Sequence, residues 1–103
     1  MEEIMPENPL RTIEKLDPAL LENVNNTRAL ALSGGALPGK TKLLIALALD
    51  ASHGATDGVR SLARSAIQAG ATKEEIMEAV RVAQFISGVG CVYIAARALD
   101  GLF

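Results

Sequence analysis

Residues 37–88 read LPGKTKLLIALALDASHGATDGVRSLARSAIQAGATKEEIMEAVRVAQFISG, and this stretch decides the fold. Its first apolar block, residues 43–49, is apolar around the whole circumference of a helix and contains alanine but no valine. That composition favours a central buried helix over a buried strand. His53-Gly54 marks the predicted end of this helix.

Two amphipathic helices are predicted after this block. From about Asp57, apolar residues return every three or four positions until Ala69-Gly70 stops the pattern. Thr72 and Glu75 are spaced as a capping box, in which each side chain can satisfy an unpaired backbone N–H group at the start of the next helix. The inner face predicted for that helix is formed by Ile76, Met77, Val80 and Ala83.

The flanking segments also indicate helices. Asp17-Pro18 is a start signal that predicts a helix over residues 18–32, because an N-cap precedes proline at the first helical position. Gly88-Val89-Gly90 interrupts the pattern, and the small and apolar residues at positions 91–102 indicate a last helix. Residues 1–9 lack an apolar period and are interpreted as an N-terminal arm, and residues 10–103 as one helical domain. The predicted fold is an all-α bundle of about five helices.

Composition excludes several classes of function. Ten basic and twelve acidic residues give a net charge of -2 without a Lys/Arg cluster, which argues against nucleic acid as a partner. The apolar runs are shorter than the roughly 18 residues of a membrane-spanning helix, and the acidic start does not resemble a signal region, so we expect a cytoplasmic protein. Cys91 is the only cysteine, so multi-cysteine metal sites are excluded, and no metal or cofactor is predicted.

The order and spacing of these signals resemble the core of the carboxymuconolactone decarboxylase and alkyl hydroperoxidase D superfamily. The most specific matches are the leucine-rich helix after Pro38 and the run AGATKEEI at residues 69–76, which in the family is a turn between two helices. The resemblance covers residues 37–88 and continues loosely to Phe103. It implies an alkyl hydroperoxidase D-like fold and an obligate homo-oligomer, commonly a trimer or hexamer, with a pocket near a subunit interface.

The residues that carry the chemistry of the best-known relatives are replaced in this sequence. Peroxidase-type members have a Cys-x-x-Cys pair at the start of the third helix, where the helix dipole favours the thiolate. Aligned on residues 69–71, these cysteines fall on Ala55 and Gly58. The family histidine, which the decarboxylase also keeps, falls on Leu62, and a glutamate one helix earlier falls on Leu43. Thiol peroxidase chemistry is therefore not expected.

Asp50 and His53 are the candidate catalytic residues. They are three positions apart at a helix end, so the carboxylate could orient and charge the imidazole as a general acid-base couple. The alternative is a solvated helix end at which a cationic histidine lies near the negative pole of the helix dipole. Their place just before the family's active-site turn keeps the catalytic hypothesis open.

Asp57, Arg60 and Arg64 are the candidate binding residues. Asp57 is either a pocket carboxylate or the N-cap of the third helix. The two arginines, one turn apart, could bind a small anionic molecule, or they could form a solvated face with intersubunit salt bridges. Cys91 lies among small and apolar residues, which predicts a packing role.

Three functional hypotheses follow from the sequence. The first is a carboxymuconolactone decarboxylase-like homo-oligomer with a small-molecule pocket at a subunit interface and without thiol peroxidase chemistry. The second is a decarboxylase or lyase-type enzyme that uses the relocated pair of Asp50 and His53. The third is a non-catalytic oligomeric partner of a catalytic paralogue or of a redox protein.

Overall fold

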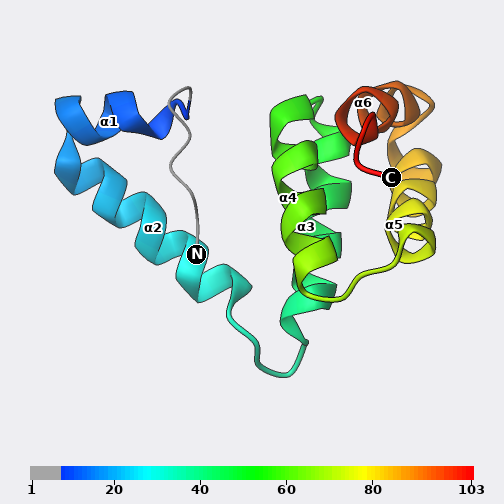
Figure 1. Cartoon of the computed structure of the whole chain (residues 1–103), viewed down its shortest axis with the longest axis horizontal. Helices are drawn as coiled ribbons and strands as arrows, with labels where there is room; N and C mark the ends of the chain where they lie inside the picture. The colour runs from blue at the N-terminus through cyan, green and yellow to red at the C-terminus, as the bar shows by residue number, and fades with distance from the viewer. Residues whose placement is uncertain (1–7) are drawn as a thin grey trace. The chain divides into compact units, whose positions relative to one another are not determined.

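The computed structural model describes residues 8–103, which contain six α-helices and no strand (Figure 1). Most of the predicted arm therefore lies outside the described residues. The chain forms two compact units, one ending at Ser33 and the other comprising Gly34–Phe103. No helix in the described range is long and apolar enough to cross a membrane.

The first unit contains α1 (Leu10–Leu16) and α2 (Pro18–Leu32), which pack against each other. Helix α2 has the predicted bounds and the predicted cap: the Asp17 carboxylate accepts a hydrogen bond of 3.0 Å from the backbone N–H of Leu20. Helix α1 was not expected, because its seven residues are too few to show a period. Neither helix buries a residue.

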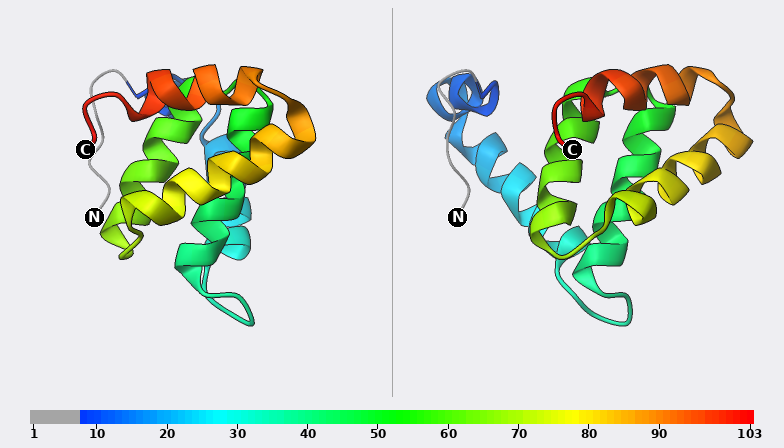
Figure 2. Two further views of the ribbon diagram at one scale, coloured as in Figure 1. Left: turned by 90° about the vertical axis from the view of Figure 1, so that its right-hand side faces the viewer. Right: turned by 45° about the vertical axis from the view of Figure 1, so that its right-hand side comes forward.

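The second unit contains four helices: α3 (Gly39–Ser52), α4 (Thr56–Gln68), α5 (Lys73–Ser87) and α6 (Gly90–Leu99). Helix α3 packs against the other three, and α6 crosses the end of the unit at which α3 finishes (Figure 2). Gly88 makes this crossing possible, because its φ of +95° ends α5 in a conformation that other residues rarely adopt.

All the buried apolar residues of the described chain lie in the second unit. Most are alanines, and their small side chains let the helices approach closely. The core consists of Leu47, Ala51, Val59, Ala63, Ala66, Ala71, Ile76, Val80, Ala83, Cys91, Ala95 and Ala98. The predicted inner face of α5 is confirmed except at Met77, which is exposed.

Helix α3 is buried on one face only in the single chain, not around its whole circumference as predicted. Leu47 and Ala51 belong to the core, whereas Ile45 is 46% exposed and Leu49 is 56% exposed. Helices α4, α5 and α6 all contact α3, but they leave these two side chains uncovered.

The predicted capping box opens α5. The hydroxyl of Thr72 accepts from the backbone N–H of Glu75 at 3.1 Å, and the carboxylate of Glu75 accepts from the backbone N–H of Thr72 at 2.9 Å. The same carboxylate forms a 3.2 Å salt bridge with Lys40. The salt bridge between Lys40 and Glu75 joins the first turns of α3 and α5, at the end of the unit opposite α6.

Candidate functional site

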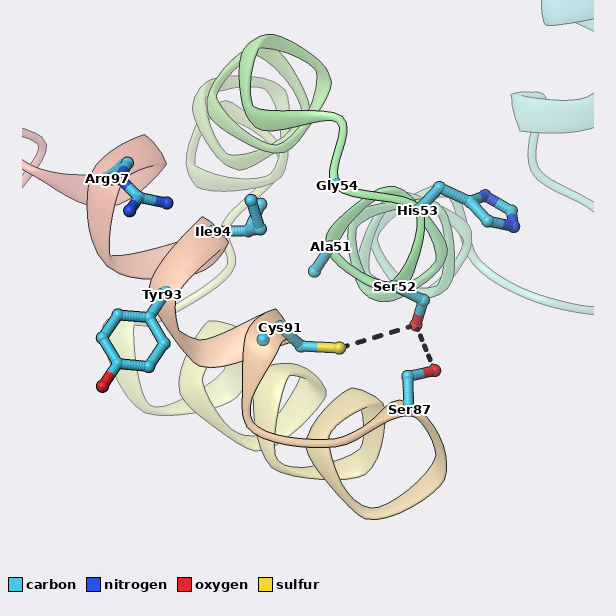
Figure 3. A pocket seen from close by; sticks show the side chains of 10 residues that line it. Ala51, Ser52, His53, Gly54, Ser87, Cys91, Tyr93, Ile94 and Arg97 are labelled. Atoms are coloured by element: carbon cyan, nitrogen blue, oxygen red, sulfur yellow. Dashed lines mark hydrogen bonds between the residues drawn. The ribbon is translucent and has the colours of Figure 1, made fainter.

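A hollow of about 580 Å³ opens where the end of α3 meets the turn between α5 and α6 (Figure 3). All of its lining residues belong to the second unit. The lining side chains that can hydrogen-bond or ionise are those of Ser52, His53, Ser87, Cys91, Tyr93 and Arg97.

Two serine hydroxyls form a hydrogen-bonded pair in this hollow. Ser87 Oγ donates to Ser52 Oγ at 3.1 Å, and Ser52 Oγ donates to the carbonyl oxygen of Ala48 at 3.0 Å (Figure 3). Each hydroxyl has one proton and two lone pairs. The Ser52 proton is committed to Ala48, so Ser52 acts as an acceptor within the hollow. The lone pairs of Ser87 are not used by these bonds and can accept from a ligand.

Cys91 closes the inner wall of the hollow. Its side chain is 3% exposed, and its Sγ lies 3.6 Å from the carbonyl oxygen of Ala83 and 4.0 Å from Ser52 Oγ. Both partners are hydrogen-bond acceptors, and neither is a cationic group of the kind found beside reactive thiols. The geometry supports the packing role predicted for Cys91.

The structure does not bring Asp50 and His53 together. His53 is exposed, and in Figure 3 its ring points away from the other labelled side chains of the hollow. No hydrogen bond or ion pair links these two residues in the described part of the chain. His53 instead terminates α3, with its backbone N–H donating to the carbonyl oxygen of Leu49 at 3.1 Å. This placement matches the solvated helix end that the sequence left as the alternative.

Asp50 is half-buried and lies against Gly58 of α4. A Cβ atom built on Gly58 would overlap the Asp50 carboxylate, so a larger residue at position 58 requires that carboxylate to move. Position 58 is where the family resemblance implies the second cysteine. The side chain of Asp50 therefore occupies part of the space that a thiol at this position would need.

Asp57 is not the N-cap of α4, so the predicted capping role is wrong. The helix begins at Thr56, its N-cap is Ala55, and no side chain caps it. The shift arises because the backbone N–H of Ala55 donates to the carbonyl oxygen of Asp50 at 2.9 Å and closes the preceding turn early. Asp57 is exposed in the first helical turn, where a negative charge is favourable.

Arg60 and Arg64 differ in their surroundings. Arg60 Nη1 donates to the carbonyl oxygens of Ala98 and Asp100, at 2.8 and 2.7 Å, and so holds the end of α6 against α4. Arg64 is exposed and makes no hydrogen bond or ion pair within residues 8–103. Neither residue lines the hollow, whose arginine is Arg97.

Sequence reasoning did not find Ser52, Ser87 and Arg97 as pocket residues. They come from three different helices, and no spacing in the sequence connects them. Their meeting depends on how α6 crosses the end of α3. Among the described residues, no group of three or more His, Cys, Asp or Glu side chains gathers as a metal site would require.

Comparison with known proteins identifies the relatives of this chain. The model of the carboxymuconolactone decarboxylase family matches residues 18–100. A similar solved structure is that of a carboxymuconolactone decarboxylase family protein from Legionella pneumophila in its apo form, with a TM-score of 0.83 and 30% sequence identity. That match covers 88% of this chain and 81% of the other. No curated protein matches this chain.

Proposed function

Because the chain belongs to the carboxymuconolactone decarboxylase family, we propose that it is a homo-oligomer that binds a small molecule in the hollow beside Ser52, Ser87 and Arg97, without thiol peroxidase activity. The hollow itself carries the proposal. Its volume of about 580 Å³ falls within the range of small-molecule sites, about 300–1,000 Å³. It is lined by apolar side chains together with a few polar ones, as such sites are.

The chemistry of the hollow favours a small anionic ligand. The Arg97 guanidinium can bind a carboxylate through two parallel hydrogen bonds. The lone pairs of Ser87 can accept from a hydrogen-bond donor elsewhere on the ligand, such as a hydroxyl group, because both serine protons are already donated. Arg97 takes over the role that the sequence assigned to Arg60, because the Arg60 guanidinium is engaged by the end of α6.

Binding is tested by titrating the protein with a panel of aliphatic and aromatic mono- and dicarboxylates, followed by calorimetry. We expect at least one carboxylate to bind, and Arg97→Gln to weaken it by at least about 10-fold, the effect of losing one charge-assisted hydrogen-bond pair. Arg64→Gln is the matched control, since Arg64 is exposed and outside the hollow. The proposal fails if no carboxylate binds or if both variants bind equally well.

The absence of thiol peroxidase activity has a separate test. A dithiol-disulfide cycle needs two thiols, whereas this chain has one cysteine, which is buried. We expect no consumption of organic hydroperoxide above the uncatalysed rate in the presence of a dithiol reductant. Turnover that is present in the wild type and lost in Cys91→Ala would refute this part of the proposal, because it would depend on the thiol.

A lyase-type activity based on Asp50 and His53 is the second candidate. The observation in its favour is that His53 borders the hollow. His53→Ala tests it: if a decarboxylase or lactone-cleaving activity of the wild type is unchanged in this variant, the acid-base role of His53 is excluded. If no activity is found at all, the non-catalytic hypothesis is favoured.

A further inference from the structure

The side chains of Ser52, Ser87 and Cys91, which we call the serine end of the hollow, all direct their protons into the protein (Figure 3). Ser52 Oγ donates to the carbonyl oxygen of Ala48 at 3.0 Å, and Ser87 Oγ donates to Ser52 Oγ at 3.1 Å. The thiol of Cys91 faces the carbonyl oxygen of Ala83 and Ser52 Oγ. The serine end therefore presents lone pairs rather than protons to a ligand.

Ser87 is the member of the serine end that can still accept a hydrogen bond. Ser52 Oγ has two lone pairs, and they face the donors Ser87 and Cys91. Ser87 Oγ accepts no hydrogen bond within residues 8–103, and the residue is exposed. Donation from Ser87 to a ligand requires that its bond to Ser52 be broken first. A ligand group that donates a proton thus fits this position better than one that only accepts.

Arg97 provides the opposite chemistry in the same hollow. Its guanidinium carries donors and no acceptor, and within the described part of the chain it makes no hydrogen bond or ion pair. In Figure 3 it lies on the other side of Cys91 from the two serines, and the hydroxyl of Tyr93 points away from the serine pair. The hollow therefore has a cationic donor at one end and a neutral acceptor at the other.

We infer that the ligand of the hollow is a hydroxycarboxylate in which a carbon chain separates the two groups, with the carboxylate bound by Arg97 and the hydroxyl donating to Ser87. The inference rests on the proposed function and names the ligand class of that site. A dicarboxylate fits less well, because its second carboxylate has no proton to donate and faces the lone pairs of Ser87. A plain monocarboxylate leaves these lone pairs without a partner. Ser87 is therefore the residue that determines specificity.

The first test compares ligands that differ at one end only. Straight-chain ω-hydroxy acids of increasing length are titrated by calorimetry beside the monocarboxylate without the hydroxyl and the dicarboxylate of the same length. We expect the best hydroxy acid to bind about 3- to 10-fold more tightly than either, the effect of one ordinary hydrogen bond. Equal affinity for the monocarboxylate, or equal or tighter binding of the dicarboxylate, overturns the inference.

The second test removes the acceptor. In Ser87→Ala the hydroxy acid and the monocarboxylate should bind equally well, because the hydroxyl has lost its partner. Ser61→Ala is the matched control, since Ser61 is exposed on α4 and does not line the hollow, and it should keep the preference of the wild type. Circular dichroism checks that each variant keeps its helices. A preference for the hydroxy acid that survives Ser87→Ala overturns the inference.

The third test concerns the direction of the bond between the serines. Ser52→Ala removes the oxygen that accepts the Ser87 proton, so Ser87 becomes able to donate to a ligand. The affinity for the dicarboxylate relative to the hydroxy acid should then rise by about 3- to 10-fold. An unchanged ratio of the two affinities shows that Ser52 does not hold the Ser87 proton and overturns the inference.

Failure of the ligand class and failure of the proposed function are distinguishable. If no carboxylate binds to the wild type, both are wrong. If carboxylates bind and Arg97→Gln weakens them, but the hydroxyl group brings no gain in affinity, the proposed site stands and the hydroxycarboxylate is rejected as its ligand.

Discussion

Gly58 lies within α4 in an ordinary helical conformation, so its backbone does not require glycine. The neighbouring Asp50 carboxylate occupies the space of a Cβ atom at position 58, so a larger residue there requires this carboxylate to move. The sequence identified position 58 as a family cysteine position, but it did not indicate which side chain occupies the space beside Gly58. That depends on the side-chain direction of a residue eight positions away, which no local pattern specifies.

The contact between Asp50 and Gly58 predicts that Gly58→Ala changes stability in opposite directions with and without the Asp50 carboxylate. Gly58→Ala alone should destabilise the protein by about 1–3 kcal/mol, because the added methyl group overpacks the site. In an Asp50→Ala background the same change should stabilise it by about 0.5–1 kcal/mol, the ordinary preference for alanine inside a helix. Urea unfolding at a fixed protein concentration measures both values. A stabilising Gly58→Ala in the wild type would contradict the overlap.

Arg60 illustrates a side chain whose hydrogen-bond partners the sequence did not indicate. Its spacing from Arg64 indicated a solvated pair or an anion site, whereas its guanidinium binds the last carbonyl groups of α6. The partners are 38 and 40 residues away in the chain, so only the tertiary structure brings them together.

Arg60→Ala should lower the free energy of unfolding by about 2 kcal/mol, because it removes hydrogen bonds from a charged donor and leaves the α6 carbonyls without that partner. Arg64→Ala removes an equal charge one turn away and should change stability by less than about 0.5 kcal/mol. Hydrogen exchange adds a local measurement: faster exchange confined to α6 in Arg60→Ala is expected. Equal stability of the two variants would show that the Arg60 bonds contribute nothing.

Helices whose ends carry capping signals were predicted closely. Asp17-Pro18 and the pair of Thr72 and Glu75 fix the starts of α2 and α5 through bonds local in sequence. The start of α4 was misplaced because it is set by a turn closed through backbone atoms of Ala55 and Asp50, which leave no sequence signature. Local signals thus predicted every helix except α1, whereas the path of α6 across α3, which builds the hollow, depends on packing.

The capping box predicts a pH dependence at the start of α5. The backbone N–H of Thr72 and the Lys40 ammonium hold the pKa of Glu75 below its ordinary value of 4.5. A carboxyl group whose pKa is lower in the folded state stabilises that state above the unfolded pKa, and this contribution is lost as the pH falls through the folded pKa. Glu75→Gln should therefore be less stable than the wild type at pH 7, and the difference should shrink below about pH 4.5.

Thermal unfolding between pH 3 and pH 7 measures this difference. Glu74→Gln is the control, since it removes a charge from the same helical turn without the contacts to Thr72 and Lys40. Thr72→Ala should cost about 1 kcal/mol, as for other N-cap threonines. A Glu75→Gln deficit that stays constant down to pH 3 would show that the charge of Glu75 is not its source.

The two units of the chain differ in how they are stabilised. Every buried apolar side chain of residues 8–103 lies between Leu47 and Ala98, in the second unit. The first unit consists of two helices that bury no residue, and isolated helices of this length are marginal in water. The sequence suggested one domain from residue 10 onwards, because the start signal that predicts α2 does not reveal whether its apolar side chains have a partner.

This division predicts the outcome of removing residues 1–33. The remaining chain keeps its entire described core and should stay helical with a cooperative thermal transition, whereas a peptide of residues 1–33 should be largely unfolded on its own. Circular dichroism of both pieces measures this directly. The peptide retains the Asp17 cap and the Pro18 start of α2, so a lack of helix in it cannot be attributed to the loss of these signals. A truncated chain that melts without cooperativity would show that α1 and α2 cover part of the core surface, in the same copy or in another.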